Sequence, residues 1–139
     1  MKLLPAIFVL ISSVPALLAE SNKGHFFTQQ FESSEIQIIE NVPYGQKLNQ
    51  GGKLSDLLVD LFLPPNASKG SKLPLIVVIH GGGFRNGTKE KNRDWAIEYA
   101  TFGYVAACIN YRLTPEDMRD KSPGNFITAA THATEDGMD

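Results

Sequence analysis

The sequence predicts an α/β fold in which antiparallel first strands lead into parallel strands joined by crossover helices. Two uncharged apolar runs, Leu75–Ile79 and Val105–Ile109, predict the parallel part. Neither run alternates polar with apolar residues, so we expect both strands to be covered on both faces. The segment between the runs predicts a helix. A strand, a helix and a strand in this order form a right-handed crossover, which places the two strands parallel in one sheet.

The predicted crossover helix begins at Trp95 in "WAIEYATFG". Trp95, Tyr99 and Phe102 fall at i, i+4 and i+7 on one side of it, and Gly103 suits its end. "NFITAATHATEDGMD" predicts the start of a second helix with one apolar, alanine-rich side. Because the chain stops at Asp139 within this helix and before another strand, we expect the sheet to be truncated.

The first strands are expected at residues 35–45 and 56–64, with a hairpin signal in "NQGG" at residues 49–52 between them. A Pro-Tyr-Gly turn is expected at the end of the first strand. The second strand has one apolar face and one mixed face. We expect the apolar face to be the buried one, and it consists of Leu57, Val59, Leu61 and Leu63. The following segment, residues 64–73, is rich in Pro, Ser, Gly and Lys and predicts a surface loop.

Composition narrows the functional classes. The chain has 139 residues and a formal net charge of −2, which gives no indication of nucleic-acid binding. Cys108 is the single cysteine and is interpreted as a small buried apolar residue. The three histidines are scattered without ligand spacing, so we expect no metal site and no cofactor. The charged run at residues 89–94, and the acids Glu135, Asp136 and Asp139, are interpreted as solvated faces.

The N-terminus predicts a secretory signal peptide. Lys2 precedes an apolar run that ends in small residues, with cleavage expected after Ala19 or, alternatively, Ala16. A transmembrane anchor is the other interpretation, but prolines and serines interrupt the run. We therefore expect residues 1–19 to be a signal peptide, residues 20–139 to be the domain, and the product to be secreted or periplasmic without a membrane span.

Three consecutive glycines follow the first parallel strand in "VVIHGGGF". They stand where a buried parallel strand ends, which is the edge at which open α/β sheets place ligand sites. The spacing matches neither a phosphate-binding P-loop nor a dinucleotide-binding turn. Consecutive glycines can present successive backbone N–H groups to one small space with no Cβ in the way. Stabilising the oxyanion of an acyl-transfer reaction needs such an arrangement.

"VVIHGGGF", followed by "INYRLTPE", resembles the N-terminal half of an α/β-hydrolase of the esterase/lipase kind. The similarity is to the hormone-sensitive-lipase-like and carboxylesterase branches and covers residues 55–139. It implies that the N–H groups of Gly82 and Gly83 are the catalytic oxyanion donors. It also implies that His80, Gly81 and Phe84 contribute to substrate binding, with His80 bracing the loop and Phe84 lining the acyl site.

The second motif carries further implications. "YRLTPE" is similar to the family's Tyr-Arg-Leu-Ala-Pro-Glu, in which Arg112 and Glu116 would anchor the loop after the strand. Asn110 stands where the family often has Asp, which puts an ion pair through that position in doubt.

A hydrolase of this fold also needs a serine in G-x-S-x-G, then an acid, then a histidine. None of the serines here has that context. The resemblance therefore implies the oxyanion-hole-bearing part of a secreted serine carboxylesterase or lipase acting on a small-molecule ester, inactive as this chain alone. Two alternatives remain: a non-catalytic adhesion or binding protein of the same fold, and a peptide or amide hydrolase of the same fold. The sequence leaves acyl preference and oligomeric state open.

Overall fold

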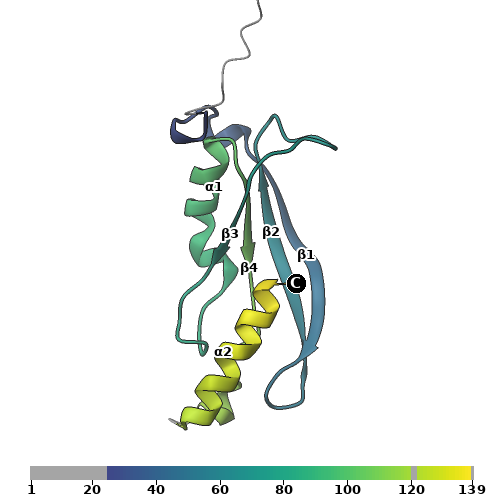
Figure 1. Ribbon diagram of the computed structural model, residues 1–139, viewed down its shortest axis with the longest axis vertical. Helices are drawn as coiled ribbons and strands as arrows, with labels where there is room; N and C mark the ends of the chain where they lie inside the picture. The colour runs from purple at the N-terminus through teal and green to yellow at the C-terminus, as the bar shows by residue number, and fades with distance from the viewer. Residues whose placement is uncertain (1–24, 120–121, 139) are drawn as a thin grey trace, which may run out of the picture.

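A computed structural model describes residues 25–119 and 122–138, so the predicted signal peptide lies outside the described residues. The fold is a mixed sheet with one helix packed along one face and a second helix on the side of the other face (Figure 1). Its elements are β1 (Gln37–Leu48), β2 (Leu54–Leu63), β3 (Leu75–Ile79), α1 (Arg93–Thr101), β4 (Val105–Ile109) and α2 (Pro123–Met138).

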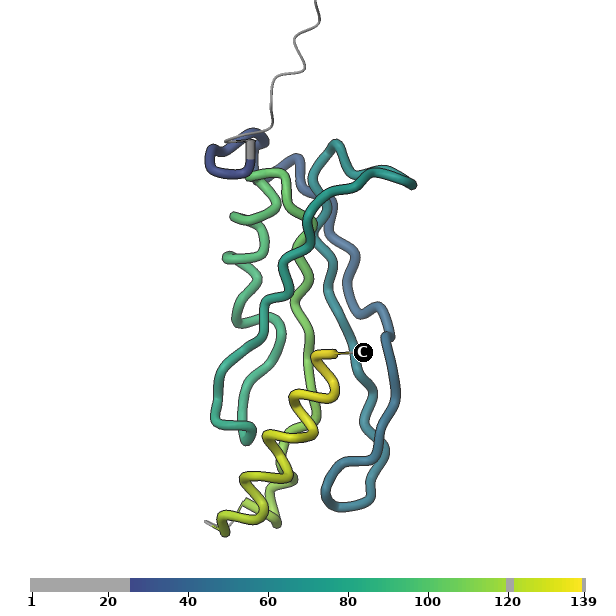
Figure 2. The backbone as a smooth tube through the Cα atoms, in the orientation of Figure 1, coloured from purple at the N-terminus to yellow at the C-terminus, as the bar shows by residue number. Residues whose placement is uncertain are grey.

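The order of the strands across the sheet is β1-β2-β4-β3. β1 pairs with β2 and β2 with β4 antiparallel, whereas β3 and β4 are parallel. The antiparallel start and the parallel crossover through α1 are therefore both confirmed. β3 and β4 run in register from Leu75 opposite Val105 to Ile79 opposite Ile109. Both strands consequently end at the same edge of the sheet, as the path of the chain shows (Figure 2).

β1 is longer than expected, because the predicted turn at Pro43 lies within the strand. Proline has no N–H, but β1 is an edge strand and needs ladder hydrogen bonds on one side only. Its pairing with β2 is irregular in two places. At the first irregularity Asn41 has φ +58°, and its N–H donates to the Asp60 carboxylate at 2.8 Å. A buried acid of β2 thus fixes the bend in β1.

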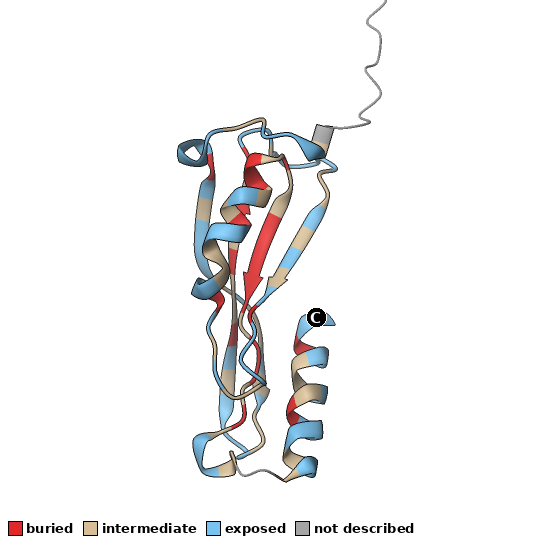
Figure 3. Ribbon diagram, turned by 90° about the vertical axis from the view of Figure 1, so that its left-hand side faces the viewer, coloured by how far each residue is buried: buried red, intermediate tan, exposed pale blue. Residues whose placement is uncertain are grey.

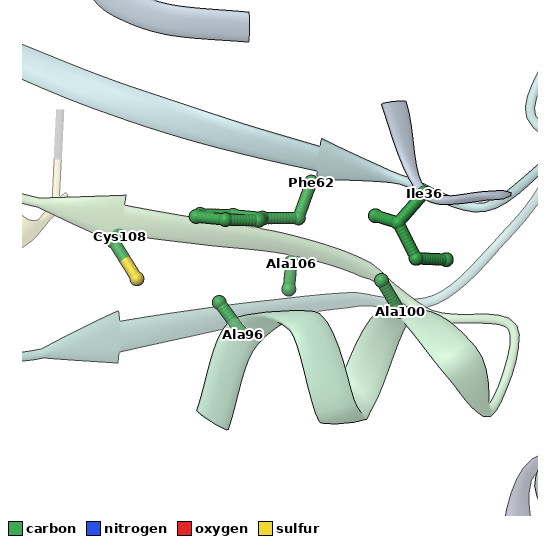
Figure 4. Packing of buried hydrophobic residues seen from close by; sticks show 6 residues of the cluster. All are labelled: Ile36, Phe62, Ala96, Ala100, Ala106 and Cys108. Carbon is green, nitrogen blue, oxygen red and sulfur yellow. The ribbon is translucent and has the colours of Figure 1, made fainter. Parts of the chain in front are cut away.

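The core lies between α1 and one face of the sheet, where Phe62 packs with alanines of α1 and β4 (Figure 4). The expectation that the apolar face of β2 is the buried one holds only at Leu57, which is 1% exposed. Phe62 and Asp60, on the mixed face, are fully buried, whereas Val59 and Leu61 are only half-buried. α1 packs against the mixed face. The Asp60 carboxylate that is buried there accepts hydrogen bonds from the Asn41 N–H and from Lys89 Nζ.

The opposite face is covered unevenly (Figure 3). β4 is buried on both sides, as predicted, but β3 is not. Leu75, Val77 and Ile79 are 59%, 44% and 53% exposed, because β3 is an edge strand of the described sheet and α1 covers only one of its sides. α2 reaches this face only at its carboxyl end, where Gly137 approaches Ile79. The same edge carries the site described below.

The burial of β2 gives a test of which face forms the core. Phe62→Ala should lower the free energy of unfolding by about 3–5 kcal/mol, because it leaves a cavity beneath α1. Leu61→Ala, one position along on the half-covered face, should cost roughly 1 kcal/mol. Urea unfolding followed by circular dichroism measures both. Equal costs, or a larger cost for Leu61, would contradict the assignment of the buried face.

Candidate active site

The glycine loop, defined here as residues 81–87, leaves the carboxyl end of β3 in a tight turn. The N–H groups of Arg85 and Asn86 both donate to the carbonyl oxygen of Gly82 at 3.2 Å. Gly82 has φ +135°, and a Cβ there would lie 1.7 Å from the carbonyl oxygen of Asn86. No side chain fits in that space, so the turn requires glycine at position 82. At Gly83, with φ +60°, a Cβ would meet open space.

The two N–H groups predicted as oxyanion donors are free to bind a ligand. Those of Gly82 and Gly83 donate to no acceptor in the part of the chain that the structure describes, and both glycines are exposed. They line a cavity of about 480 Å³. Its walls are residues 79–84 and Tyr111 on one side, and Ala133, Thr134, Gly137 and Met138 of α2 on the other. All five residues that the sequence nominated therefore lie together around one cavity.

His80 lies beneath the glycine loop, buried to 3% exposure. Its Nδ1 lies 3.0 Å from the carbonyl oxygen of Gly81, which requires the proton on Nδ1. The ring stacks on Tyr111 with centroids 4.4 Å apart, and the Tyr111 hydroxyl donates to the His80 carbonyl oxygen at 2.9 Å. Gly87 closes over the ring, since a Cβ there would lie 2.1 Å from Nδ1. His80 thus has the contacts that a bracing role requires.

Tyr111 lines the cavity as well, and sequence reasoning gave it no role. Burial raises the pKa of its hydroxyl, so it remains a hydrogen-bond donor at neutral pH. Phe84 packs edge-on against Tyr111 and Phe126, at centroid distances of 6.2 and 5.5 Å. The Phe84 carbonyl oxygen also accepts a hydrogen bond from the N–H of Thr114 at 2.8 Å. The glycine loop is therefore attached to the segment that follows β4.

Arg112 anchors that segment through a partner that the sequence did not indicate. Its Nε lies 2.9 and 3.0 Å from the two carboxylate oxygens of Asp136, and its backbone N–H donates to the same carboxylate at 2.8 Å. The Asp136 side chain is fully buried, so its interpretation as part of a solvated face was wrong. Hydrogen bonds to Asp136 and Glu135 raise the pKa of Arg112, although burial opposes them. The ion pair joins α2 to the end of β4.

The other predicted anchors behave differently. Glu116 is exposed, and its carboxylate has no hydrogen bond or ion pair within residues 25–119 and 122–138. The expected anchoring role of this side chain therefore has no partner among the described residues and stays a prediction. The Asn110 side chain accepts a hydrogen bond from the N–H of Leu58 at 2.5 Å and donates to the carbonyl oxygen of Asp56 at 3.4 Å. It makes hydrogen bonds to β2 instead of an ion pair.

Lys89 is buried, which corrects the interpretation of residues 89–94 as a solvated charged face. Its Nζ lies 2.9 Å from the Asp60 carboxylate and 2.7 Å from that of Glu90. Burial on its own would lower the pKa of Lys89, but hydrogen bonds to Asp60 and Glu90 outweigh it and raise the pKa. Hydrogen bonds from Lys89 and Thr88 lower the pKa of Glu90 to about 2. The Lys89–Asp60 ion pair connects the segment after the glycine loop to β2.

Two other kinds of site, a cysteine nucleophile and a metal site, find little support in the described residues. Cys108 is buried, and desolvation together with the charge of Asp60 raises the pKa of its thiol to about 11, which disfavours the nucleophilic thiolate. Across residues 25–119 and 122–138, no three His, Cys, Asp or Glu side chains are grouped as a metal ion would need.

Over the same described ranges, no helix has the length and apolar character needed to cross a membrane.

A family model, BD-FAE, matches residues 59–124. This esterase-like domain includes the glycine loop, β4 and the "YRLTPE" segment, so the resemblance that the sequence predicted is confirmed over that stretch. Among curated proteins, the chain is 33% identical over 63 residues to the non-reducing polyketide synthase atr1 of Stereocaulon alpinum. That match covers 45% of this chain and 2% of the synthase.

Two solved esterases are also similar. A bacterial heroin esterase is 26% identical with a TM-score of 0.46, and the match covers 78% of this chain and 34% of that one. Esterase B from Lactobacillus Rhamnosis is 22% identical with a TM-score of 0.45, and the match covers 66% of this chain and 27% of that one. The chain therefore spans about a third or less of these solved structures.

Alanine substitutions test which positions of the glycine loop require glycine. Gly83→Ala should cost about 1–2 kcal/mol of stability, because the left-handed conformation is strained for alanine but the space is open. Gly82→Ala should cost clearly more, since its Cβ would overlap the Asn86 carbonyl oxygen. Urea unfolding followed by Trp95 fluorescence compares the two. Similar losses from both substitutions would show that the turn at Gly82 is not as close as described.

The thiol of Cys108 gives a pH-dependent test. At pH 8 a thiol with a pKa of about 11 holds roughly 100-fold less thiolate than one at 9.0, so alkylation of the folded chain by iodoacetamide should be slow. The rate should rise as the pH approaches 11, and it should rise at pH 8 when urea exposes the thiol. Mass spectrometry follows the reaction at this single cysteine. Equal rates in the folded and unfolded chains at pH 8 would contradict the assignment.

Proposed function

We propose that this chain, whose fold is that of the esterase-like α/β hydrolases, forms the oxyanion-hole part of a serine carboxylesterase. The observation that carries the proposal is the pair of N–H groups of Gly82 and Gly83. Both are without an acceptor in the described ranges, and both glycines line a cavity with apolar walls. Preorganised backbone donors beside an apolar space suit a substrate with a carbonyl oxygen and an apolar acyl group.

In the proposed reaction, a serine hydroxyl gives its proton to a general base while its oxygen attacks the ester carbonyl carbon, and the carbonyl electron pair moves onto the carbonyl oxygen. Gly82 and Gly83 donate hydrogen bonds to that oxygen, which stabilises the negative charge. Collapse of the intermediate breaks the bond to the alcohol, which leaves with a proton from a general acid. Water then hydrolyses the acyl-enzyme by the same steps. His80 and Tyr111 keep the loop in place during this cycle.

In the proposed enzyme, this chain binds the oxyanion, and residues outside it act as nucleophile, base and acid. No serine of the 139-residue sequence stands in G-x-S-x-G, and the chain spans about a third of the solved esterases it resembles. We therefore assign the activity to a polypeptide in which this chain is accompanied by a segment that carries the nucleophile, base and acid. Secretion, directed by a signal peptide at residues 1–19, is part of the proposal.

Binding of a carboxylate tests the oxyanion site without any nucleophile. We expect butyrate, added to the ¹⁵N-labelled 139-residue chain, to shift the amide resonances of Gly82 and Gly83 in a saturable way, while that of Gly103 stays unchanged. Butanol is the matched control ligand, because it has a similar tail but no carboxylate and should not shift the two glycine amides. Unchanged Gly82 and Gly83 resonances with butyrate, or equal shifts with butanol, would contradict the proposal.

A further inference from the structure

We propose that the Arg112–Asp136 ion pair is a positioning pair that holds the last turns of α2 in place as the wall receiving the apolar acyl group. This inference rests on the proposed function and deepens it. Asp136 itself does not line the cavity, but its neighbours Gly137 and Met138 do, together with Ala133 and Thr134. The ion pair therefore acts on the ligand only through the position of the helix.

The wall is apolar and close to the sheet. At Gly137 a Cβ would lie 3.7 Å from the Ile79 side chain and 4.0 Å from that of Ile109, so the helix backbone itself approaches β3 and β4. Met138 is 75% exposed at the rim, and its flexible side chain can adapt to an acyl group. The oxyanion donors lie on the opposite wall. A carbonyl bound there would extend its acyl chain toward α2.

The other contacts of α2 lie mostly near its start, where the Gln50 side chain donates to the Asn125 carbonyl oxygen at 2.8 Å and Phe126 packs on Phe84. Within the helix only Ala129 and Asp136 are buried, whereas Phe126 and Ile127 are at least half exposed. Apolar burial therefore gives α2 little attachment, and the charged contacts near its C-terminal end carry more of it. The buried carboxylate of Asp136 has its close partner in Arg112, at 2.8 Å, whereas Lys47 Nζ lies farther away, at 3.7 Å, and is partly exposed.

Arg112 is in turn fixed from several directions. Besides Asp136, its guanidinium donates to the carbonyl oxygen of Leu48 at 3.0 Å, to that of His132 at 3.3 Å and to the carboxylate of Glu135 at 2.8 Å. These bonds connect the β1–β2 hairpin, the end of β4 and two turns of α2 in one cluster. The planar guanidinium suits such fixed, multiple hydrogen bonds better than a lysine ammonium would. The cluster thus sets where α2 lies relative to the glycine loop.

The length dependence of carboxylate binding separates positioning from a general loss of fold. Octanoate and butyrate share the head group, but only octanoate reaches far along the α2 wall. In the ¹⁵N-labelled 139-residue chain we expect octanoate to bind about tenfold more tightly than butyrate and to shift the amides of Ala133 and Gly137. Asp136→Asn should abolish this preference while butyrate still shifts the amides of Gly82 and Gly83. Glu116→Gln is the matched control, because it also changes an acid to its amide but at an exposed residue outside the Arg112 cluster, and it should keep the preference.

Arg112→Lys is the second variant, since it keeps the charge opposite Asp136 but loses the forked hydrogen bonds, and it should reduce the preference severalfold. An unchanged preference in a folded Asp136→Asn or Arg112→Lys chain would overturn the inference. So would unfolding of both variants, which would make the pair a requirement of the fold. Octanoate shifts confined to Leu75 and Val77 would also overturn it. Absence of butyrate shifts in the unsubstituted chain would instead reject the proposed oxyanion site.

Discussion

The parallel pairing of β3 with β4 is the constraint on which the site depends. Because the two strands run in register, their carboxyl ends reach the same edge at the same level. His80 and Tyr111, which follow them, are thereby brought into a stacked pair. That pair supports the glycine loop from below, and the Phe84 carbonyl attaches it to the segment after β4. The register of this one strand pair therefore determines where the N–H groups of Gly82 and Gly83 lie.

Much of this arrangement follows from local sequence. Uncharged runs flanking an amphipathic segment predict β3, α1 and β4, because a crossover has one preferred hand. Three successive glycines predict a loop whose backbone N–H groups can face a ligand. The structure adds that a residue with a Cβ cannot make the turn at Gly82. The exposure of β3 was not predictable in the same way. Whether a strand is central or at an edge depends on its neighbours in the sheet, which no pattern within the strand reveals.

The ion pairs were missed for a related reason. Asp136 pairs with Arg112 and Lys89 with Asp60, across 24 and 29 residues. In sequence each of these side chains looks like an ordinary surface charge, because nothing nearby identifies a distant partner. The same holds for the α2 wall of the cavity, whose position relative to the glycine loop is set by one of these pairs. Polar residues that join elements far apart in sequence are thus the part of the site that only the fold reveals.

The oxyanion-binding role proposed for the Gly82 and Gly83 N–H groups can be tested by an amide-to-ester substitution in the backbone. In a polypeptide that carries this chain with its nucleophile segment, replacing the Gly83 N–H by an ester oxygen removes one donor and adds no side chain. We expect kcat for p-nitrophenyl butyrate to fall about 10²–10³-fold while KM changes little. A kcat close to that of the unsubstituted enzyme would show that the Gly83 N–H does not stabilise the oxyanion.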